Sequence, residues 1–179
     1  KHPNGLANGS GMLGRNLTDS VGYGMTAHIP ALDGLPRYNS DGMGGMHVYV
    51  PWWLWDKKNK DFPRGYHIEI GGGFGIPQIG SFHGECHASE GYGAALKAGI
   101  RERFGAYVHL AGRGEQIPNE YTYCDIDPDV VDQWGIPVLR FHFAWTENER
   151  KQAGHMYETF KGILETMGGK IVGPPPSTS

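Results

Sequence analysis

An alternating stretch near the middle of the chain constrains the fold more than any other feature. In residues 61–75, DFPRGYHIEIGGGFG, apolar and polar side chains alternate with the period of a β-strand. The apolar set is Tyr66, Ile68 and Ile70, and the polar set is His67 and Glu69. The glycine run that follows ends the strand and leaves room for another chain or a ligand. The stretch therefore predicts a strand with one face in the core and one face available for binding.

The composition fits one globular domain. The chain has 179 residues, of which 39% are hydrophobic and 20% are charged, so it can bury one substantial core. No apolar run reaches the length that a bilayer requires, and we expect no membrane span. The net charge of -3 and the scattered basic residues argue against nucleic acid as a partner. The 29 glycines and 12 prolines indicate many tight turns between strands.

The remaining patterns predict an α+β fold. Strand patterns occur at residues 21–30, 43–53, 107–111, 120–124 and 138–145. Helical patterns occur at residues 91–104, 127–134 and 147–167. The second helix is predicted because Asp127 supplies an N-cap and Pro128 a first turn, and the third because Thr146 and Glu149 form a capping box. We predict a mostly antiparallel sheet of about five or six strands with helices packed on one face, which leaves the other face free.

Three further clusters suggest chemistry, each with an ordinary structural alternative. The tryptophans Trp52, Trp53 and Trp55 can form a flat sugar platform, although aromatic clusters more often lie in a core or an interface. Residues 83–87, HGECH, gather metal-ligand types without an evident second ligand pair, so we expect a polar loop and no metal. Residues 71–75 are rich in glycine but lack the GxGxxG order. We therefore expect no nucleotide to be held by this chain alone.

The polar face of the alternating strand is the best candidate for ligand binding. It carries His67 and Glu69, and His109 lies on another predicted strand. Imidazole and carboxylate groups on a sheet suit hydroxyl-rich ligands, because each alcohol both donates and accepts a hydrogen bond. The alternative is that these groups meet solvent or one another. A structural, hydrogen-bonded role is the first interpretation of three other histidines, which are His28, His47 and His142.

The order of the motifs resembles that of a known enzyme family. The segments GMLGRNLTDS, HIPAL, DGMGGMHVYVPWW, FPRGYHIEIGGG and WGIPVLRFHFAWTENE follow one another across nearly the whole chain. As an ordered set they resemble the substrate-binding part of the glucose–methanol–choline (GMC) family of flavin oxidoreductases. Within that family the chain looks most like bacterial sugar oxidoreductases related to pyranose oxidase. The resemblance thus implies that this chain is one part of a flavoenzyme.

The resemblance also implies a division of labour within a longer polypeptide. In the family, an N-terminal dinucleotide fold holds FAD, an antiparallel sheet roofs the substrate, and a C-terminal stretch supplies a His–Asn or His–His pair that takes the alcohol proton. This chain matches the roof. The resemblance assigns residues 1–20 to the seam with an FAD-binding domain, residues 21–169 to the substrate-binding domain, and residues 170–179 to a linker. The catalytic pair is expected beyond Ser179.

Two candidate residues carry over from the family to this sequence. The strand HIEI is similar to the family strand whose polar residue contacts the sugar, which places Glu69 at that position with a carboxylate where the relative has an amide. His109 falls near another substrate-facing position on the neighbouring strand. Residues 15–19 match a GxGRNLxDH-like segment that we interpret as the seam, and Ser20 stands where a histidine is common.

The leading hypothesis is the substrate-binding part of an FAD-dependent oxidoreductase that acts on CH–OH groups of a sugar or other alcohol. Its partners would be the small-molecule substrate and the remainder of its own polypeptide. The alternative is a self-contained carbohydrate-binding or interaction module built on the tryptophan cluster. A third hypothesis is a metal-dependent enzyme at residues 83–87. Saccharide binding by the chain alone favours the module, and an apolar surface left for a further domain favours the flavoenzyme.

Overall fold

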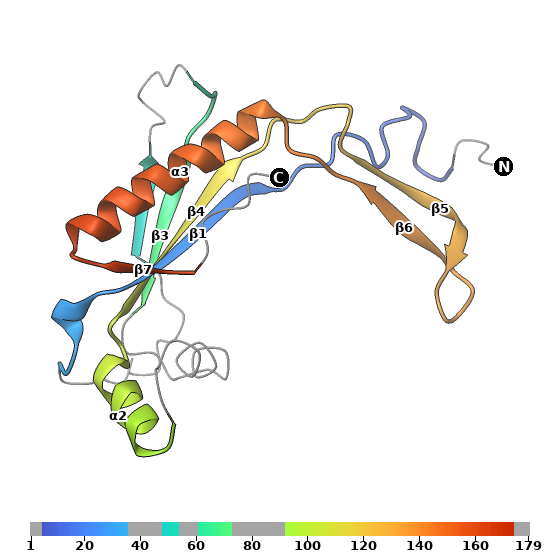
Figure 1. Ribbon diagram of the computed structural model, residues 1–179. Coiled ribbons are helices and arrows are strands. Elements are labelled where there is room, and N and C mark those ends of the chain that lie inside the picture. Colours follow the sequence, from blue (N-terminus) through green and yellow to red (C-terminus); the bar gives the residue numbers. More distant parts are fainter. Residues whose placement is uncertain (1–4, 36–47, 54–60, 73–91, 174–179) are drawn as a thin grey trace.

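The computed structural model of the chain describes residues 5–35, 48–53, 61–72 and 92–173. Within these ranges a five-stranded sheet has the order β2-β3-β4-β1-β7, and β5 and β6 form a second sheet (Figure 1). In chain order the elements are β1 (Ser20–His28), the 3-10 helix η1 (Pro30–Leu32), β2 (Val48–Trp53), β3 (Tyr66–Gly72), α2 (Ala94–Arg103), β4 (Tyr107–Glu115), β5 (Tyr123–Val131), β6 (Pro137–His142), α3 (Glu147–Thr166) and β7 (Lys170–Val172). The paired strands are antiparallel, which confirms the predicted α+β class.

Strand β3 has the two faces that its alternation predicts. Tyr66 and Ile68 are buried, whereas His67 and Glu69 on the other side are only partly buried. The strand pairs with β2 along one edge and with β4 along the other. The middle of the sheet is nevertheless β4, which also pairs with β1 over the whole length of both strands. The sheet is therefore organised around β4, and the alternating strand β3 lies next to it.

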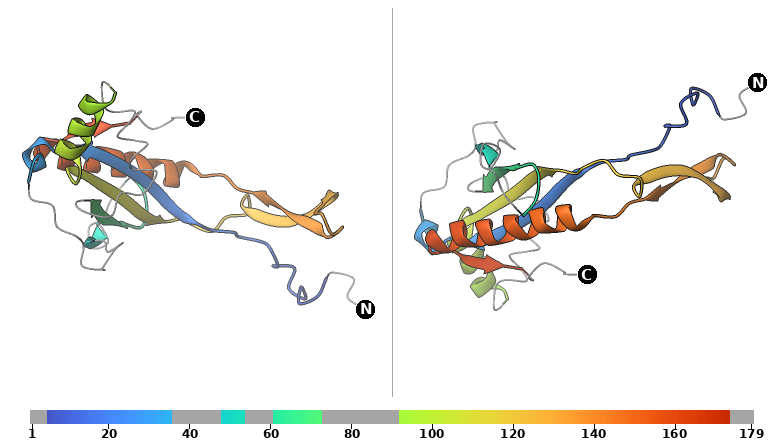
Figure 2. Two further views of the ribbon diagram at one scale, coloured as in Figure 1. Left: turned by 90° about the horizontal axis from the view of Figure 1, so that it is seen from below. Right: turned by 90° about the horizontal axis from the view of Figure 1, so that it is seen from above.

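Helix α3 covers one face of the five-stranded sheet (Figures 1 and 2). Its capping box forms as predicted, because the Glu149 carboxylate accepts a hydrogen bond from the Thr146 backbone N–H at 2.8 Å. Met156, Phe160 and Leu164 project from one stripe of the helix and are fully buried. They join residues of β1, β3 and β4 in a single core cluster. Burial of this stripe anchors the helix to the sheet.

Two glycines of β4 allow α3 to approach the sheet closely. Gly112 and Gly114 lie on the face that α3 covers. A Cβ atom at Gly112 would lie 2.6 Å from Sδ of Met156, and a Cβ atom at Gly114 would collide with the side chain of Gln152. The strand pattern in the sequence predicts that this strand ends at residue 111. That boundary is wrong, because these two glycines serve packing within a strand that continues to residue 115.

The helix predicted at residues 127–134 is also wrong. Strand β5 runs through the first part of that segment and pairs with β6. The Asp127 carboxylate accepts hydrogen bonds from the backbone N–H groups of Asp129 and Val130, at 2.9 and 3.0 Å. This local turn accompanies a shift in the register of β5 against β6. An aspartate followed by proline therefore produced a bulged strand here and not a helix cap.

Several boundaries differ from the sequence prediction by a few residues. The strand expected at residues 120–124 begins at residue 123, and the strand expected at residues 138–145 ends at residue 142. Helix α2 forms within the expected range, but none of its 10 residues is buried. Strand β7, at the beginning of the segment assigned to a linker, pairs with β1 at the edge of the sheet. The described part of the strand expected at residues 43–53 is β2.

Candidate functional site

The face of the five-stranded sheet opposite α3, here called the open face, carries the residues that the sequence analysis selected. Successive residues of a strand point to opposite sides, so the strand register identifies the members of each face. In the register of β3 against β4, His67 pairs with Arg113 and Gly71 pairs with His109, with Glu69 between them. The structure therefore places His67, Glu69 and His109 on the open face.

Glu69 lies at the centre of a small cluster of charged and polar groups. Its Oε1 atom is 3.2 Å from Nε2 of His67, and its Oε2 atom is 3.7 Å from Nε of Arg113. The Glu69 side chain is only 14% exposed, whereas half of the Arg113 side chain is exposed. The ring of Tyr49 on β2 packs against the His67 ring at 5.6 Å between centroids. The carboxylate thus lies between His67 on its own strand and Arg113 on β4, while Tyr49 on β2 packs against His67.

Arg113 is the member of this cluster that the sequence analysis missed. It lies between the two packing glycines of β4, beyond the predicted end of that strand at residue 111. In the structure every second residue from Leu110 to Gly114 is buried and Arg113 is exposed, but the sequence of this run has no apolar alternation that would identify Arg113. Gly22 on β1 lies beside the guanidinium, where a Cβ atom would make an ordinary contact with Nη1 at 3.7 Å.

His109 is positioned by strand β1. Its Nδ1 atom is 2.9 Å from Oγ1 of Thr26. A Cβ atom at Gly24 would lie 3.2 Å from Cε1 of the imidazole, so the absence of a side chain at Gly24 lets the ring approach β1 closely. His109 faces Gly71 in the register, two residues along β4 from the residue that faces Glu69. The two predicted residues share the open face, with His109 displaced along the strands.

A shallow pocket of about 680 Å³ lies at one end of the open face. It is lined by residues of β1, β2, β3 and β4 and of the turn before β3, which are Ser20, Tyr49, Pro51, Arg64, Gly65, Tyr66, His67, Arg113, Gly114 and Glu115. Of the predicted site residues, His67 lines this pocket. Glu69 and His109 are not among the described residues that line it. The two ion-pair partners of Glu69, which are His67 and Arg113, both line the pocket.

The turn that enters β3 presents an arginine to this pocket. Arg64 has a φ of 72°, a left-handed backbone conformation that few residues with side chains adopt. Its Nε atom lies 3.6 Å from Oε2 of Glu115, and both side chains are largely exposed. Each arginine that lines the pocket is therefore accompanied by a glutamate. The resulting surface is rich in hydrogen-bonding groups and close to neutral in charge.

The segment assigned to the seam contacts β5 and the end of β4, and its last residue, Ser20, lines the open-face pocket. Arg15 forms an isolated bridge with Tyr123 of β5, and its guanidinium lies 4.8 Å above that ring. Asn16 has a left-handed φ of 54°. The backbone N–H of Asp19 donates to Oε1 of the buried Gln116 at 3.0 Å. The structure thus joins this segment to the beginning of β5 and to the end of β4.

Other sequence candidates have different outcomes. His28 bonds to Asp33 at 2.7 Å, and His142 lies 3.3 Å from Asp125, which agrees with structural roles for both histidines. His47, Trp55 and residues 83–87 lie outside the described residues, as do the side chains of Trp52 and Trp53. The sugar-platform and metal hypotheses therefore remain predictions. Neither helix in the described residues is long and apolar enough to cross a membrane.

The chemistry of the open face is that of polar recognition. A carboxylate held between an imidazole and a guanidinium offers acceptors and donors within a few ångströms of each other. Such a set can satisfy several alcohol groups at once, because each hydroxyl requires both a donor and an acceptor. The charged groups of this cluster are paired with one another.

No family model matches the chain. It is 26% identical over 183 residues to the 2-methyl-1,2-propanediol dehydrogenase of Mycolicibacterium austroafricanum, a match that covers 98% of this chain and 32% of the relative. It is 27% identical over 137 residues to the gluconate 2-dehydrogenase flavoprotein of Pantoea cypripedii, which covers 73% of this chain and 22% of the relative. The chain therefore spans about a third and about a fifth of the lengths of these two curated relatives. Both are dehydrogenases by name, and one is named as a flavoprotein.

Proposed function

We propose that this chain is the substrate-binding part of an FAD-dependent oxidoreductase of the GMC type, which oxidises a CH–OH group of a sugar or other alcohol. The observation that carries the proposal is the similarity, over 98% of the chain, to a dehydrogenase named for a diol. A second relative is named for gluconate, another compound rich in hydroxyl groups, and for a flavin. The motif order of the sequence supports the same family.

The open face supplies the part of this function that belongs to the chain itself. We assign Glu69 to accept a hydrogen bond from a substrate hydroxyl, while His67 and Arg113 hold the carboxylate and offer donors beside it. His109, fixed by Thr26, would contact the substrate further along the strands. These residues orient the hydroxyl groups and keep one face of the ligand away from water.

FAD would be held by polypeptide outside these 179 residues. The glycine-rich residues 71–75 lack the order of a dinucleotide-binding loop, so no site for the cofactor is assigned to this chain. When bound, FAD supplies the acceptor for the hydride that leaves the substrate carbon. The catalytic His–Asn or His–His pair is likewise assigned to residues beyond Ser179. The domain ranges 1–20, 21–169 and 170–179 belong to this same proposal.

The test is the Glu69→Gln variant of the protein encoded by the complete reading frame. We expect a raised KM or a lowered kcat with sugars and small diols, and an unchanged flavin absorption spectrum. Glu158→Gln is the matched control, because Glu158 lies exposed on α3, on the other side of the sheet. Loss of the flavin spectrum in Glu69→Gln, or equal kinetics in both variants, would contradict the assignment. A flavin-free product that binds saccharides would instead support the self-contained module.

A further inference from the structure

Strands β5 and β6, with the turn between them, form a ribbon that projects away from the five-stranded sheet (Figures 1 and 2). The strand register sorts the side chains of this β5–β6 ribbon into two faces. Its cross-strand pairs are Cys124 with Phe141 and Ile126 with Leu139 on one face, and Tyr123 with His142 and Asp125 with Arg140 on the other. The ribbon is therefore amphipathic, with an apolar face and a polar face.

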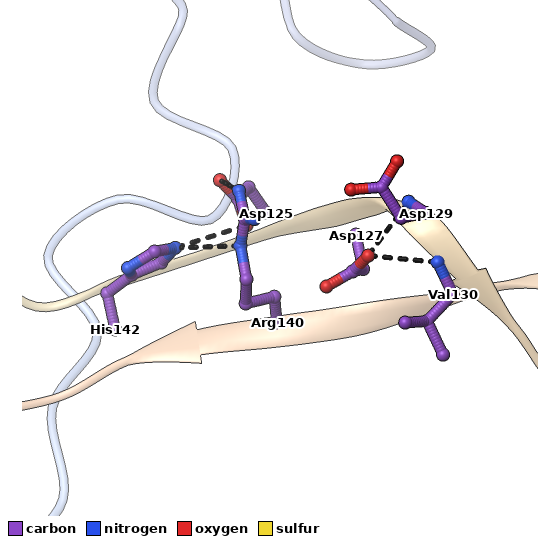
Figure 3. A network of polar contacts seen from close by, with 6 residues as sticks. All are labelled: Asp125, Asp127, Asp129, Val130, Arg140 and His142. Carbon is purple, nitrogen blue, oxygen red and sulfur yellow. Dashed lines mark hydrogen bonds and ion pairs between the residues drawn. The ribbon is translucent and has the colours of Figure 1, made fainter.

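The charged side chains of the polar face pair with one another (Figure 3). Arg140 donates from Nε and Nη2 to the two carboxylate oxygens of Asp125, both at 3.0 Å, and His142 lies 3.3 Å from Asp125. The hydrogen bond from Arg140 holds the pKa of Asp125 below its usual value. The rings of Tyr123 and His142 stack at 4.1 Å between centroids, with the Arg15 guanidinium over Tyr123. This face needs no further partner to pair its charges.

The apolar face is different, because its large side chains are exposed. Phe141 is 61% exposed, Ile126 is 58% exposed and Leu139 is 54% exposed. Trp134 and Ile136, in the turn, are exposed as well. A two-stranded ribbon by itself is at best marginally stable in water, and a contiguous apolar surface of this kind marks a contact with another surface.

The segment before β1 runs along the edge of this ribbon. The backbone N–H of Leu17 donates to the carbonyl oxygen of Thr122 at 2.9 Å, and the N–H of Cys124 donates to the carbonyl oxygen of Gly14 at 2.8 Å. A side chain at Gly14 would collide with the Cys124 carbonyl group, so the two segments touch closely. Three apolar residues of the same segment are exposed, namely Leu6, Met12 and Leu13. This is the segment that our proposed function assigns to the seam.

We propose that the apolar face of the β5–β6 ribbon packs against the part of the same longer polypeptide that lies outside these 179 residues, the part to which the proposed function assigns the flavin. The inference rests on the proposed function for the identity of that part. Two observations support it. The ribbon is joined to the seam, and this chain covers only 32% and 22% of the lengths of its two relatives. A surface in the same polypeptide is also present at a high effective concentration because it is covalently tethered, whereas a separate partner must associate from solution.

The first test measures solvent access to Phe141 in the protein encoded by the complete reading frame. Hydroxyl-radical footprinting followed by mass spectrometry compares Phe141 with Tyr92, a ring that is exposed and lies outside the ribbon. We expect Phe141 to be labelled at least about tenfold more slowly than Tyr92, after correction for the intrinsic reactivities of the two rings. Light scattering on the same sample reports whether the protein is a monomer. Equal labelling of the two rings overturns the proposal.

A second test uses variants of the same complete protein. Phe141→Asp places a charge in the contact, and we expect amide hydrogen exchange in the ribbon and in residues 5–17 to accelerate at least about tenfold. Phe141→Leu keeps an apolar side chain and retains the slow exchange. Tyr92→Asp is the control and leaves exchange in the ribbon unchanged. Equal exchange in Phe141→Asp and the unmodified protein contradicts the proposal.

The outcomes separate this inference from the proposed function. A monomer with a protected ribbon and a bound flavin supports both. A monomer with a protected ribbon but no flavin supports the packing and overturns the flavin assignment. Protection that disappears when a dimer is diluted to monomers identifies a second copy as the occupant and overturns the packing. A reading frame that encodes only these 179 residues overturns it as well.

Discussion

The hydroxyl group of Tyr66 lies 2.9 Å from Nδ1 of His155, which joins strand β3 to helix α3 through a polar contact beside the apolar core. The same hydroxyl donates to Oγ1 of Thr159 at 3.1 Å, and the Tyr66 ring packs edge-on against Phe160. Tyr66 thus orients α3 as well as filling space beneath it.

Tyr66→Phe tests this contact. The variant keeps the ring and removes the hydroxyl group, so it leaves two α3 side chains without their partner on the strand. We expect the free energy of unfolding to fall by about 1 to 3 kcal/mol. Urea denaturation of the variant and the unmodified chain provides the measurement. Tyr121→Phe serves as the control, because that ring is 68% exposed. An unchanged midpoint for Tyr66→Phe would show that the contact is not stabilising.

Close packing of α3 on β4 predicts opposite effects for two glycine-to-alanine changes. Gly112→Ala should destabilise the chain by about 1 to 3 kcal/mol, because the new methyl group meets Met156 and Phe160, which are fully buried. Gly154→Ala lies on the exposed side of α3 with open space around it, and should stabilise the chain by up to about 1 kcal/mol through helix propensity. Thermal denaturation measures both variants. A change of the same sign in both would contradict this packing.

The buried carboxylate of Glu149 predicts a loss of stability in acid. Burial alone raises its pKa, but hydrogen bonds from the Thr146 hydroxyl and from the backbone N–H groups of Ile117 and Thr146 outweigh burial and lower it below the ordinary 4.5. A lowered pKa in the folded state contributes stability above the unfolded pKa, and that contribution is lost as the pH falls through the folded pKa.

Glu149→Gln removes this titration. We expect the variant to be less stable than the unmodified chain at pH ~7, and the difference to shrink by pH ~3 as Glu149 takes up a proton. Urea denaturation at several pH values measures the difference. Glu147→Gln, at the exposed side of the same helical turn, is the control and should show a much smaller dependence. A constant difference between Glu149→Gln and the unmodified chain across this range would rule out the linkage.

The ion pair between Glu69 and Arg113 predicts coupled effects on substrate kinetics in the complete protein. If both side chains act as one group, Glu69→Gln and Arg113→Gln together should cost less in kcat/KM than the sum of the single changes. We expect a coupling of about 0.5 to 3 kcal/mol from a double-mutant cycle. Strict additivity would show that the two residues act independently. The flavin spectrum of each variant checks that the cofactor site is intact.

Local sequence patterns correctly predicted those elements whose structure depends on residues close together in the chain. The alternation from Tyr66 to Ile70 identified both faces of β3 before any partner strand was known. The capping box and the apolar stripe identified α3 and its start. These signals succeed because each depends on neighbours within one or two turns of the same segment.

The failures arise where distant partners decide the structure. Gly112 and Gly114 suggest a turn by themselves and become strand residues only because α3 requires space above them. Asp127 resembles a helix cap until β6 pairs with its segment. Arg113 escaped notice for the same reason, since its place beside Glu69 follows from a pairing between β3 and β4. The sequence predicted the open face by its residues but not the full cluster that lies on it.

Strand β1 lies early in the chain, but its partners come much later: β4 pairs with its whole length and β7 pairs with Thr26–His28 on the other edge. Ser20 pairs with Glu115 of β4, and Thr26 pairs with Val172 of β7. During synthesis, β1 therefore leaves the ribosome long before either partner exists. Val21 and Met25, which are buried in the folded chain, therefore remain exposed to solvent during synthesis. Such exposed apolar side chains make the nascent chain prone to aggregation. Completion of the sheet is consequently a late event that follows the release of residue 172 from the exit tunnel.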